Sequence, residues 1–215
     1  QTTDAMSEEM LEEGSNVFKN WAKTSETPKF AFLETPAWPE ADIGAKNAIE
    51  TAITSLSSAC QRERLPDPFS KIIDYHAAVF AAENSHYYGT FLDNHSELLS
   101  EKLRDRLIVS KTTLASEYIA ALNARDKIYH SLEALLDDYD AVLCLAATGA
   151  APIGFETTGS AIFNGLWTYL GVPCLSLPLL TTENMPLGLQ LVGKRGNERK
   201  LFKTANWIEN HLKAS

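Results

Sequence analysis

The pattern of hydrophobic and polar positions predicts strands near the start of the chain and in its final third, with several helices between them. A short apolar run at 30–33 precedes a segment, 41–59, in which apolar residues recur three and four apart. These patterns predict a strand and then a helix. Helical spacing continues in three further segments, at 69–91, 98–107 and 114–136. The last of them is the strongest periodic signal in the chain.

The stretch 140–193 carries the signals for a buried sheet. A continuous apolar run, 141–147, begins after Asp140 and ends near Gly149 and Pro152, as expected of a strand that is buried on both faces. The pattern then predicts an apolar helix at 160–170 and a second strand at 174–177. A turn at 183–186 leads into a third strand at 187–192, and an amphipathic helix begins at 197. This order predicts an α/β fold in which a mixed β-sheet is layered by α-helices.

Two segments give weaker signals. Residues 1–28 are acidic at first and then carry scattered apolar positions, which indicates a terminal arm that is loose or contains one or two short helices. Residues 62–68 form a polar connection with two prolines, and whether an edge strand occurs there stays open. We therefore expect an arm at 1–28 and one main domain at 29–215.

Composition narrows the class of partner. The formal net charge of −9 argues against a nucleic-acid or anionic-membrane surface, because either would require a basic patch. No apolar run approaches the roughly 20 residues that span a bilayer. Three cysteines without a close pair, two of them in expected strands, indicate a reducing, cytoplasmic setting.

An ordered set of short motifs runs through the final third. Its members are Ala151-Pro152, Thr158-Gly159, Phe163-Asn164, Trp167, Gly171-Val172-Pro173, Leu175-Ser176-Leu177-Pro178, Pro186-Leu187-Gly188-Leu189-Gln190 and Val192-Gly193. In this order they resemble the C-terminal half of amidase signature enzymes, and weaker similarity extends back to Lys29. The resemblance implies the amidase signature fold and a hydrolase acting on amide C–N bonds, and we expect no cofactor.

The resemblance also implies reactive groups that the chain does not contain. Amidase signature enzymes use a lysine and two serines in a Gly/Ser-rich segment of the N-terminal half. The Ser57-Ser58 pair lies in a helical pattern without flanking glycines. We therefore expect a C-terminal fragment that has no catalytic residue and is inactive alone. Its exposed apolar face would be covered by the missing N-terminal half or by a second copy.

A different class of function stays open beside this one. The second hypothesis is that the chain is a complete, non-catalytic α/β protein that uses a pocket or the exposed sheet edge for binding. A Gly/Ser-rich segment upstream, with a lysine well before it, would favour the enzyme. Unrelated upstream sequence would favour the binding protein.

The loop 148–158 is the first candidate site, because ligands of open α/β sheets bind beyond the carboxyl ends of strands. By resemblance, this loop and the following helix line the pocket for a small amide substrate. The expected substrate-binding residues are Ile153, Phe155, Thr158, Phe163, Asn164 and Trp167. The alternative is that Phe163 and Trp167, four residues apart on a buried helix, belong only to the core.

Gln190 stands between two leucines in an expected strand. A buried amide without partners costs about 1–3 kcal/mol. Gln190 therefore either gives structural support through hydrogen bonds that brace the catalytic half, or it lies on a solvated strand face. The pattern favours neither.

A metal site is not expected. His76, Glu83 and His86 share one expected helix, and the Glu83–His86 spacing occurs in di-iron ligand pairs. Such a site needs a second Glu-x-x-His, which the sequence lacks. The sequence therefore predicts neither a metal ligand nor a catalytic residue within these 215 residues.

Overall fold

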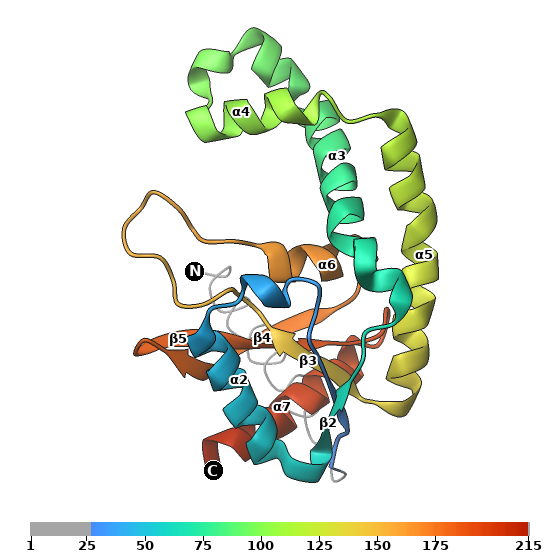
Figure 1. The fold of residues 1–215 in the computed structure, drawn as a ribbon, viewed down its shortest axis with the longest axis vertical. Helices are drawn as coiled ribbons and strands as arrows, with labels where there is room; N and C mark the ends of the chain where they lie inside the picture. The colour runs from blue at the N-terminus through green and yellow to red at the C-terminus, as the bar shows by residue number, and fades with distance from the viewer. Residues whose placement is uncertain (1–26, 215) are drawn as a thin grey trace, which may run out of the picture.

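The structure is a computed structural model that describes residues 27–214. The expected terminal arm, 1–28, lies outside the described residues except for its last two. One five-stranded sheet crosses the molecule (Figure 1), with its strands in the order β2 (Cys60–Glu63), β1 (Phe30–Leu33), β3 (Ala141–Leu145), β5 (Met185–Val192) and β4 (Cys174–Thr182). β1 runs parallel to β2 and β3, whereas β5 runs antiparallel to β3 and β4. This mixed sheet confirms the α/β class.

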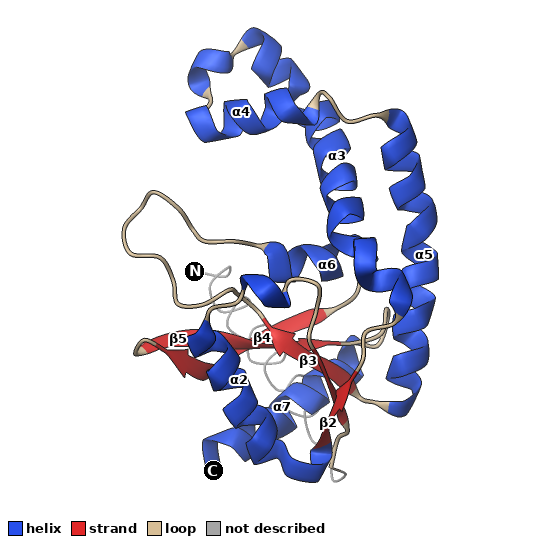
Figure 2. Cartoon of the chain, in the orientation of Figure 1, coloured by secondary structure: helices blue, strands red, loops and turns tan. Residues whose placement is uncertain are grey.

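Helices cover the sheet on both faces (Figure 2). The α-helices are α2 (Ile43–Leu56), α3 (Ile72–Asn94), α4 (Glu101–Ser110), α5 (Ala115–Asp138), α6 (Ile162–Leu170) and α7 (Glu198–Ala214). Short 3-10 helices are η1 (Trp38–Glu40), η2 (Ser57–Ala59), η3 (Asp67–Lys71) and η4 (Ser96–Leu98). α2 and α7 pack on one face, and α6 lies on the other with α3 and α5 against it. α3 and α5 extend beyond the sheet, and α4 overhangs α6 from the end of α3.

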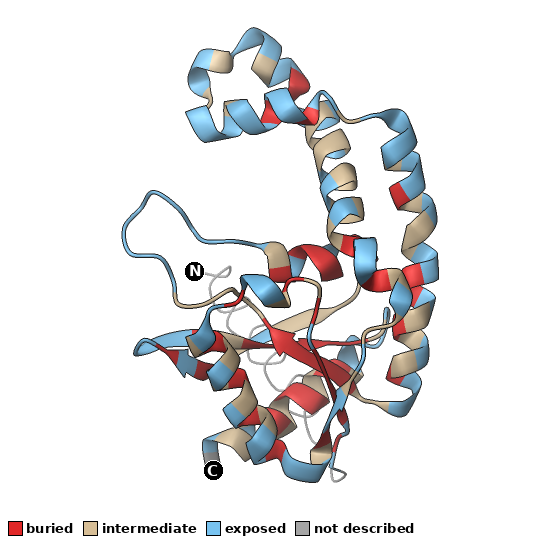
Figure 3. Cartoon of the chain, viewed as in Figure 1, coloured by how far each residue is buried: buried red, intermediate tan, exposed pale blue. Residues whose placement is uncertain are grey.

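β3 is buried along its whole length. All five of its residues are buried, and its backbone pairs with β1 on one side and β5 on the other. Buried residues concentrate on the sheet and on the helix faces that meet it, whereas the far end of the α3–α4 arm is largely exposed (Figure 3). The predicted apolar run at 141–147 therefore marks the centre of the core.

The end of α6 follows the predicted glycine signal. Gly171 adopts the left-handed conformation, with φ 62°, at the helix C-terminus. Its N–H donates to the Thr168 carbonyl, and the guanidinium of Arg195 donates from Nε to the Leu170 carbonyl at 2.9 Å. The last turn therefore has partners for carbonyls that a helix end otherwise leaves free.

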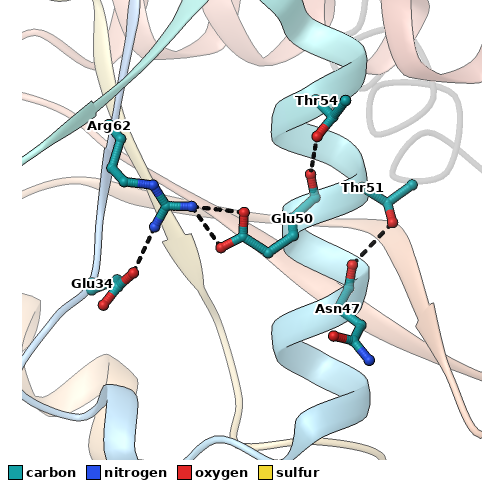
Figure 4. A network of polar contacts seen from close by, with 6 residues as sticks. All are labelled: Glu34, Asn47, Glu50, Thr51, Thr54 and Arg62. Carbon is teal, nitrogen blue, oxygen red and sulfur yellow. Dashed lines mark hydrogen bonds and ion pairs between the residues drawn. The ribbon is translucent and has the colours of Figure 1, made fainter.

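The edge strand β2 forms where the sequence gives little strand signal. Its residues pair in parallel with β1, from Phe30 opposite Cys60 to Leu33 opposite Glu63. Arg62 accounts for part of this pairing (Figure 4): its guanidinium donates to Glu34 at 2.5 Å and to both carboxylate oxygens of Glu50 on α2. These side chains are nearly half exposed, so each ion pair contributes only about 0–1 kcal/mol.

Arg62 also makes an apolar contact. Its guanidinium lies 4.6 Å from the centre of the Phe32 ring. A residue that is polar in the sequence thus covers an aromatic ring of the neighbouring strand. A polar edge strand held by such contacts cannot be detected from hydrophobic periodicity.

β4 is longer than the predicted 174–177 and continues to Thr182. Its pairing with β5 shifts register between Leu177 and Leu180, and Pro178 lies inside the shift. A proline interrupts the expected strand pattern, which explains why the pattern ends there although the strand resumes beyond it.

We expect truncation at the centre of β3 to be costly. Leu143→Ala should lower the free energy of unfolding by about 2–5 kcal/mol, because the side chain is fully buried and its removal leaves a cavity. Leu98→Ala, at a leucine that is 77% exposed, is the control and should cost less than about 0.5 kcal/mol. Urea denaturation of both variants measures the difference. Equal losses would contradict the assignment of β3 as the core.

Candidate functional site at the carboxyl end of β3

The segment that leaves β3 is the most exposed apolar part of the described chain. Residues 151–161 are all exposed, and the side chains of Ile153 and Phe155 reach full exposure, at 104% and 105%. These two large apolar side chains, separated by one residue on the loop, are both in contact with water. Contiguous exposed apolar surface often marks a place where a ligand or another protein segment binds.

A chain of amide hydrogen bonds lies directly beneath this loop. Gln190 Nε2 donates to Asn164 Oδ1 at 2.8 Å, and Asn164 Nδ2 donates to the carbonyl oxygen of Ala146 at 3.2 Å. Gln190 is 4% exposed, whereas Asn164 is exposed. The chain therefore connects the buried interior of β5, through α6, to the first residue after β3.

A glycine allows the strands to approach closely at this point. A Cβ atom on Gly188 would lie 2.2 Å from Ser176 Oγ and 2.8 Å from the Ala146 Cβ. The Ala146 N–H donates to the Gly188 carbonyl at 3.2 Å. The Leu187-Gly188-Leu189-Gln190 motif thus places a glycine where β4 and the exit from β3 leave no room for a side chain.

Two thiols near the site are unreactive. The Cys144 thiol donates to Gln190 Oε1 at 3.4 Å. Burial raises its pKa far above the ordinary value, the neighbouring Cys174 raises it further, and a contact from the Trp167 indole N–H lowers it. That contact falls short of hydrogen-bond geometry, since Trp167 Nε1 has no hydrogen-bond partner. Burial also raises the pKa of Cys174 to about 12, so neither thiol ionises near neutral pH to become a nucleophile.

The structure does not bring all the expected substrate-binding residues together. Ile153 and Thr158 lie on the exposed loop, and Asn164 lies at the exposed side of α6. Phe163 and Trp167 point into the core instead, with exposed fractions of 0% and 1%. Trp167 packs edge-on against Phe69 with 6.4 Å between ring centres.

A groove beside Asn164 was not expected from the sequence. It has a volume of about 770 Å³ and lies between α3, α4 and the beginning of α6. Its lining includes His76 and Phe80 of α3, Arg106 and Val109 of α4, and Ile162 of α6, together with Asn164. A volume of this size is typical of small-molecule sites.

Gly165 allows the His76 imidazole to lie against α6. A Cβ at this position would lie 2.6 Å from Cε1 and 2.7 Å from Nδ1 of the ring. Burial lowers the pKa of His76 below its ordinary value, so the imidazole is neutral at neutral pH. A glycine inside an apolar helix costs up to about 1 kcal/mol relative to alanine. Its presence at position 165 is therefore a sequence signal for close packing against this helix, although it does not identify His76 as the partner.

The described residues offer neither a metal centre nor a membrane span. Between residues 27 and 214, no three His, Cys, Asp or Glu side chains are arranged to hold a metal ion. No helix within that range is long and apolar enough to cross a membrane.

A model of the protein family described as Amidase matches residues 1–202. The A subunit of glutamyl-tRNA(Gln) amidotransferase from a Nitratiruptor species is 29% identical over 145 residues, which cover 62% of this chain and 33% of that protein. The corresponding protein of Thermotoga maritima is 30% identical over 127 residues, which cover 52% of this chain and 26% of that protein. The chain thus spans about a third or less of these relatives.

Solved structures share the fold. A crystal structure of an amidase matches with a TM-score of 0.77 at 22% identity, over 87% of this chain and 46% of that one. The structure of 6-aminohexanoate cyclic dimer hydrolase complexed with substrate matches with a TM-score of 0.67 at 15% identity, over 89% and 46%. The amidotransferase A subunit from T. maritima matches with a TM-score of 0.59 at 25% identity, over 83% and 41%. This chain spans less than half of each.

The buried amide chain should contribute measurably to stability. Gln190→Leu should lower the free energy of unfolding by about 1 kcal/mol, because the hydrogen bond to Asn164 Oδ1 is lost and the buried Cys144 thiol loses its acceptor. The control is Gln61→Leu on the exposed edge strand β2, where Gln61 Oε1 accepts from the Tyr139 hydroxyl. Urea denaturation should give a smaller loss for the control. A loss at Gln190 no larger than at Gln61 would remove the structural role assigned to this amide.

Burial of His76 predicts a pH dependence of stability. The unfolded state binds the proton near pH 6.5, whereas the folded state binds it only at lower pH because its pKa is depressed. The free energy of unfolding should therefore fall as pH decreases below about 6.5, and His76→Asn should make that fall less steep. His86→Asn, at an exposed position of the same helix, is the matched control. Thermal unfolding between pH 7.5 and 5 measures both, and equal flattening in the two variants would contradict the effect of burial.

Proposed function

Because the chain belongs to the amidase family, we propose that it forms the C-terminal part of an enzyme that cleaves amide bonds. In this proposal residues 29–215 supply the scaffold and part of the substrate pocket, and the groups that react with the amide come from a segment outside the 215 residues. The compared structures support this division, because this chain covers only 41–46% of them. The names of the relatives, which include an amidase and an amidotransferase, support amide chemistry.

The observation that carries the proposal is the fixed amide of Asn164 beside an exposed apolar loop. Gln190 holds Asn164 Oδ1 from inside the sheet, and the Ala146 carbonyl accepts from its Nδ2. The side chain is thereby oriented at the carboxyl end of a buried strand, where α/β proteins bind ligands. Because a buried glutamine fixes the orientation of this amide, a ligand can hydrogen-bond to it in only a limited set of orientations.

The loop supplies the apolar side of the same site. Ile153 and Phe155 are fully exposed in this chain and would lose contact with water when substrate or the missing segment covers them. In the proposal Ile153, Thr158 and Asn164 contact the substrate. Phe163 and Trp167 act from the core, where they fix the position of α6.

The reaction follows the family resemblance. A serine oxygen adds to the amide carbonyl carbon, backbone N–H groups stabilise the oxyanion, and the C–N bond then breaks, which leaves an ester of the serine that water hydrolyses. A lysine, acting through a second serine, takes the proton of the attacking hydroxyl, and the departing amine receives a proton. We place the lysine and both serines outside these 215 residues. The missing N-terminal half, or a second copy of the chain, would cover the exposed loop.

Activity assays test the proposal. The 215-residue chain alone should release no aniline from anilides and no ammonia from primary amides, because it lacks the nucleophile. A longer protein that adds an N-terminal Gly/Ser-rich segment should release one of them. Its Asn164→Ala variant should raise KM, since an oriented substrate contact is lost. Turnover by the 215-residue chain, or none by the longer protein with any of these substrates, would contradict the proposal.

A further inference from the structure

The groove between α3, α4 and α6 has the composition of a binding site for an organic acid. It opens beside Asn164 and therefore continues the candidate site toward the helical arm. We propose that it binds an apolar arm of the substrate that ends in a carboxylate, an inference that rests on the proposed function. The amide to be cleaved would then lie near Asn164, and the carboxylate would lie against α4.

The apolar part of the ligand has walls on three helices. Phe80 and Ala77 of α3, Val109 of α4 and Ile162 of α6 line the groove. Phe80 and Val109 are 45% and 68% exposed, although both are large apolar residues. An alkyl or aryl group between them would remove this surface from water.

Arg106 supplies the charge that selects a carboxylate. Its guanidinium lies 6.0 Å from the centre of the Phe80 ring and makes no ion pair or side-chain hydrogen bond with any residue of the described chain. A guanidinium offers paired N–H donors that match a carboxylate. The neighbouring Asp105 also lines the groove and would repel an anion placed next to it. In the proposal the carboxylate therefore pairs with Arg106 on the side away from Asp105.

His76 supplies a second polar group at the inner wall. Its imidazole lies over Gly165 and contacts the Phe80 ring, with 5.8 Å between ring centres. Neither ring nitrogen forms a hydrogen bond with a described residue. The neutral ring therefore has an N–H donor and an acceptor nitrogen without a partner among the described residues, and its Nδ1 side lies against Gly165. The glycine at position 165 is what makes room for this ring.

Binding by the 215-residue chain tests the inference without any catalysis. The probes are 4-phenylbutyrate, the uncharged 4-phenylbutanamide and the cationic 4-phenylbutylamine, titrated by calorimetry or by NMR. The acid should bind about tenfold more tightly than the amide, because it alone pairs with Arg106. Arg106→Gln should abolish this preference. Lys102→Gln removes one positive charge from an exposed position of the same helix outside the groove lining and should preserve it.

Arg106→Lys provides a variant that keeps the charge, and it should retain part of the preference for the acid. Circular dichroism of each variant confirms that it is folded before titration. Equal affinity for acid and amide, tighter binding of the amine, no binding of any probe, or equal effects of Arg106→Gln and Lys102→Gln would each overturn the inference.

The outcome also separates this inference from the proposed function. If a longer protein cleaves amides but its groove shows no preference for the acid, the inferred carboxylate arm is refuted and the proposed amidase function stands. If the chain binds the acid through Arg106 but the longer protein cleaves no amide, the proposed amidase function is refuted and the acid-binding groove stands.

Discussion

The complete burial of β3 is the constraint on which the rest of the structure depends. Its five residues are all buried, and the strand pairs with β1 through its first three residues and with β5 through its last four. The backbone then emerges into the loop after Leu145. β5 pairs antiparallel with this buried strand, and the register of the pairing places Gln190 opposite Cys144. A glutamine in that register has little access to water, and its amide must find partners within the protein. The partner it finds, Asn164, lies at the end of β3 where the candidate site begins.

The proposed site thus lies at the boundary between an apolar sheet and the exposed loop at one end of it. The interior is built from apolar strands and α6, and its cysteines remain protonated because burial raises their pKa values. The hydrogen-bonded amide of Asn164 and the exposed loop 151–161 lie beyond the carboxyl end of β3. Binding and positioning are what such an arrangement can provide. Bond cleavage requires a nucleophile, which in our proposal comes from the segment that completes the enzyme.

Much of the fold follows from the sequence because its elements are defined by local patterns. The apolar run at 141–145, the helix that ends at Gly171 and the long α5 each carry a strong periodicity or a capping residue. β2 could not be predicted in this way, because Arg62 and the ladder to β1 hold four mostly polar residues in place. The candidate loop could be located from its position after a buried strand. The groove could not, because His76 and Gly165 are far apart in sequence and meet only when α3 packs on α6.

The most direct test of the central claim is to locate the nucleophile itself. The longer protein that contains this chain would be treated with a fluorophosphonate, which reacts covalently with activated serines, and the modified peptide would be identified by mass spectrometry. The account predicts a single adduct on a serine outside these 215 residues. An adduct on any serine within them, or a protein that forms no adduct at all, would contradict the claim that the chain supplies the pocket while a neighbouring segment supplies the chemistry.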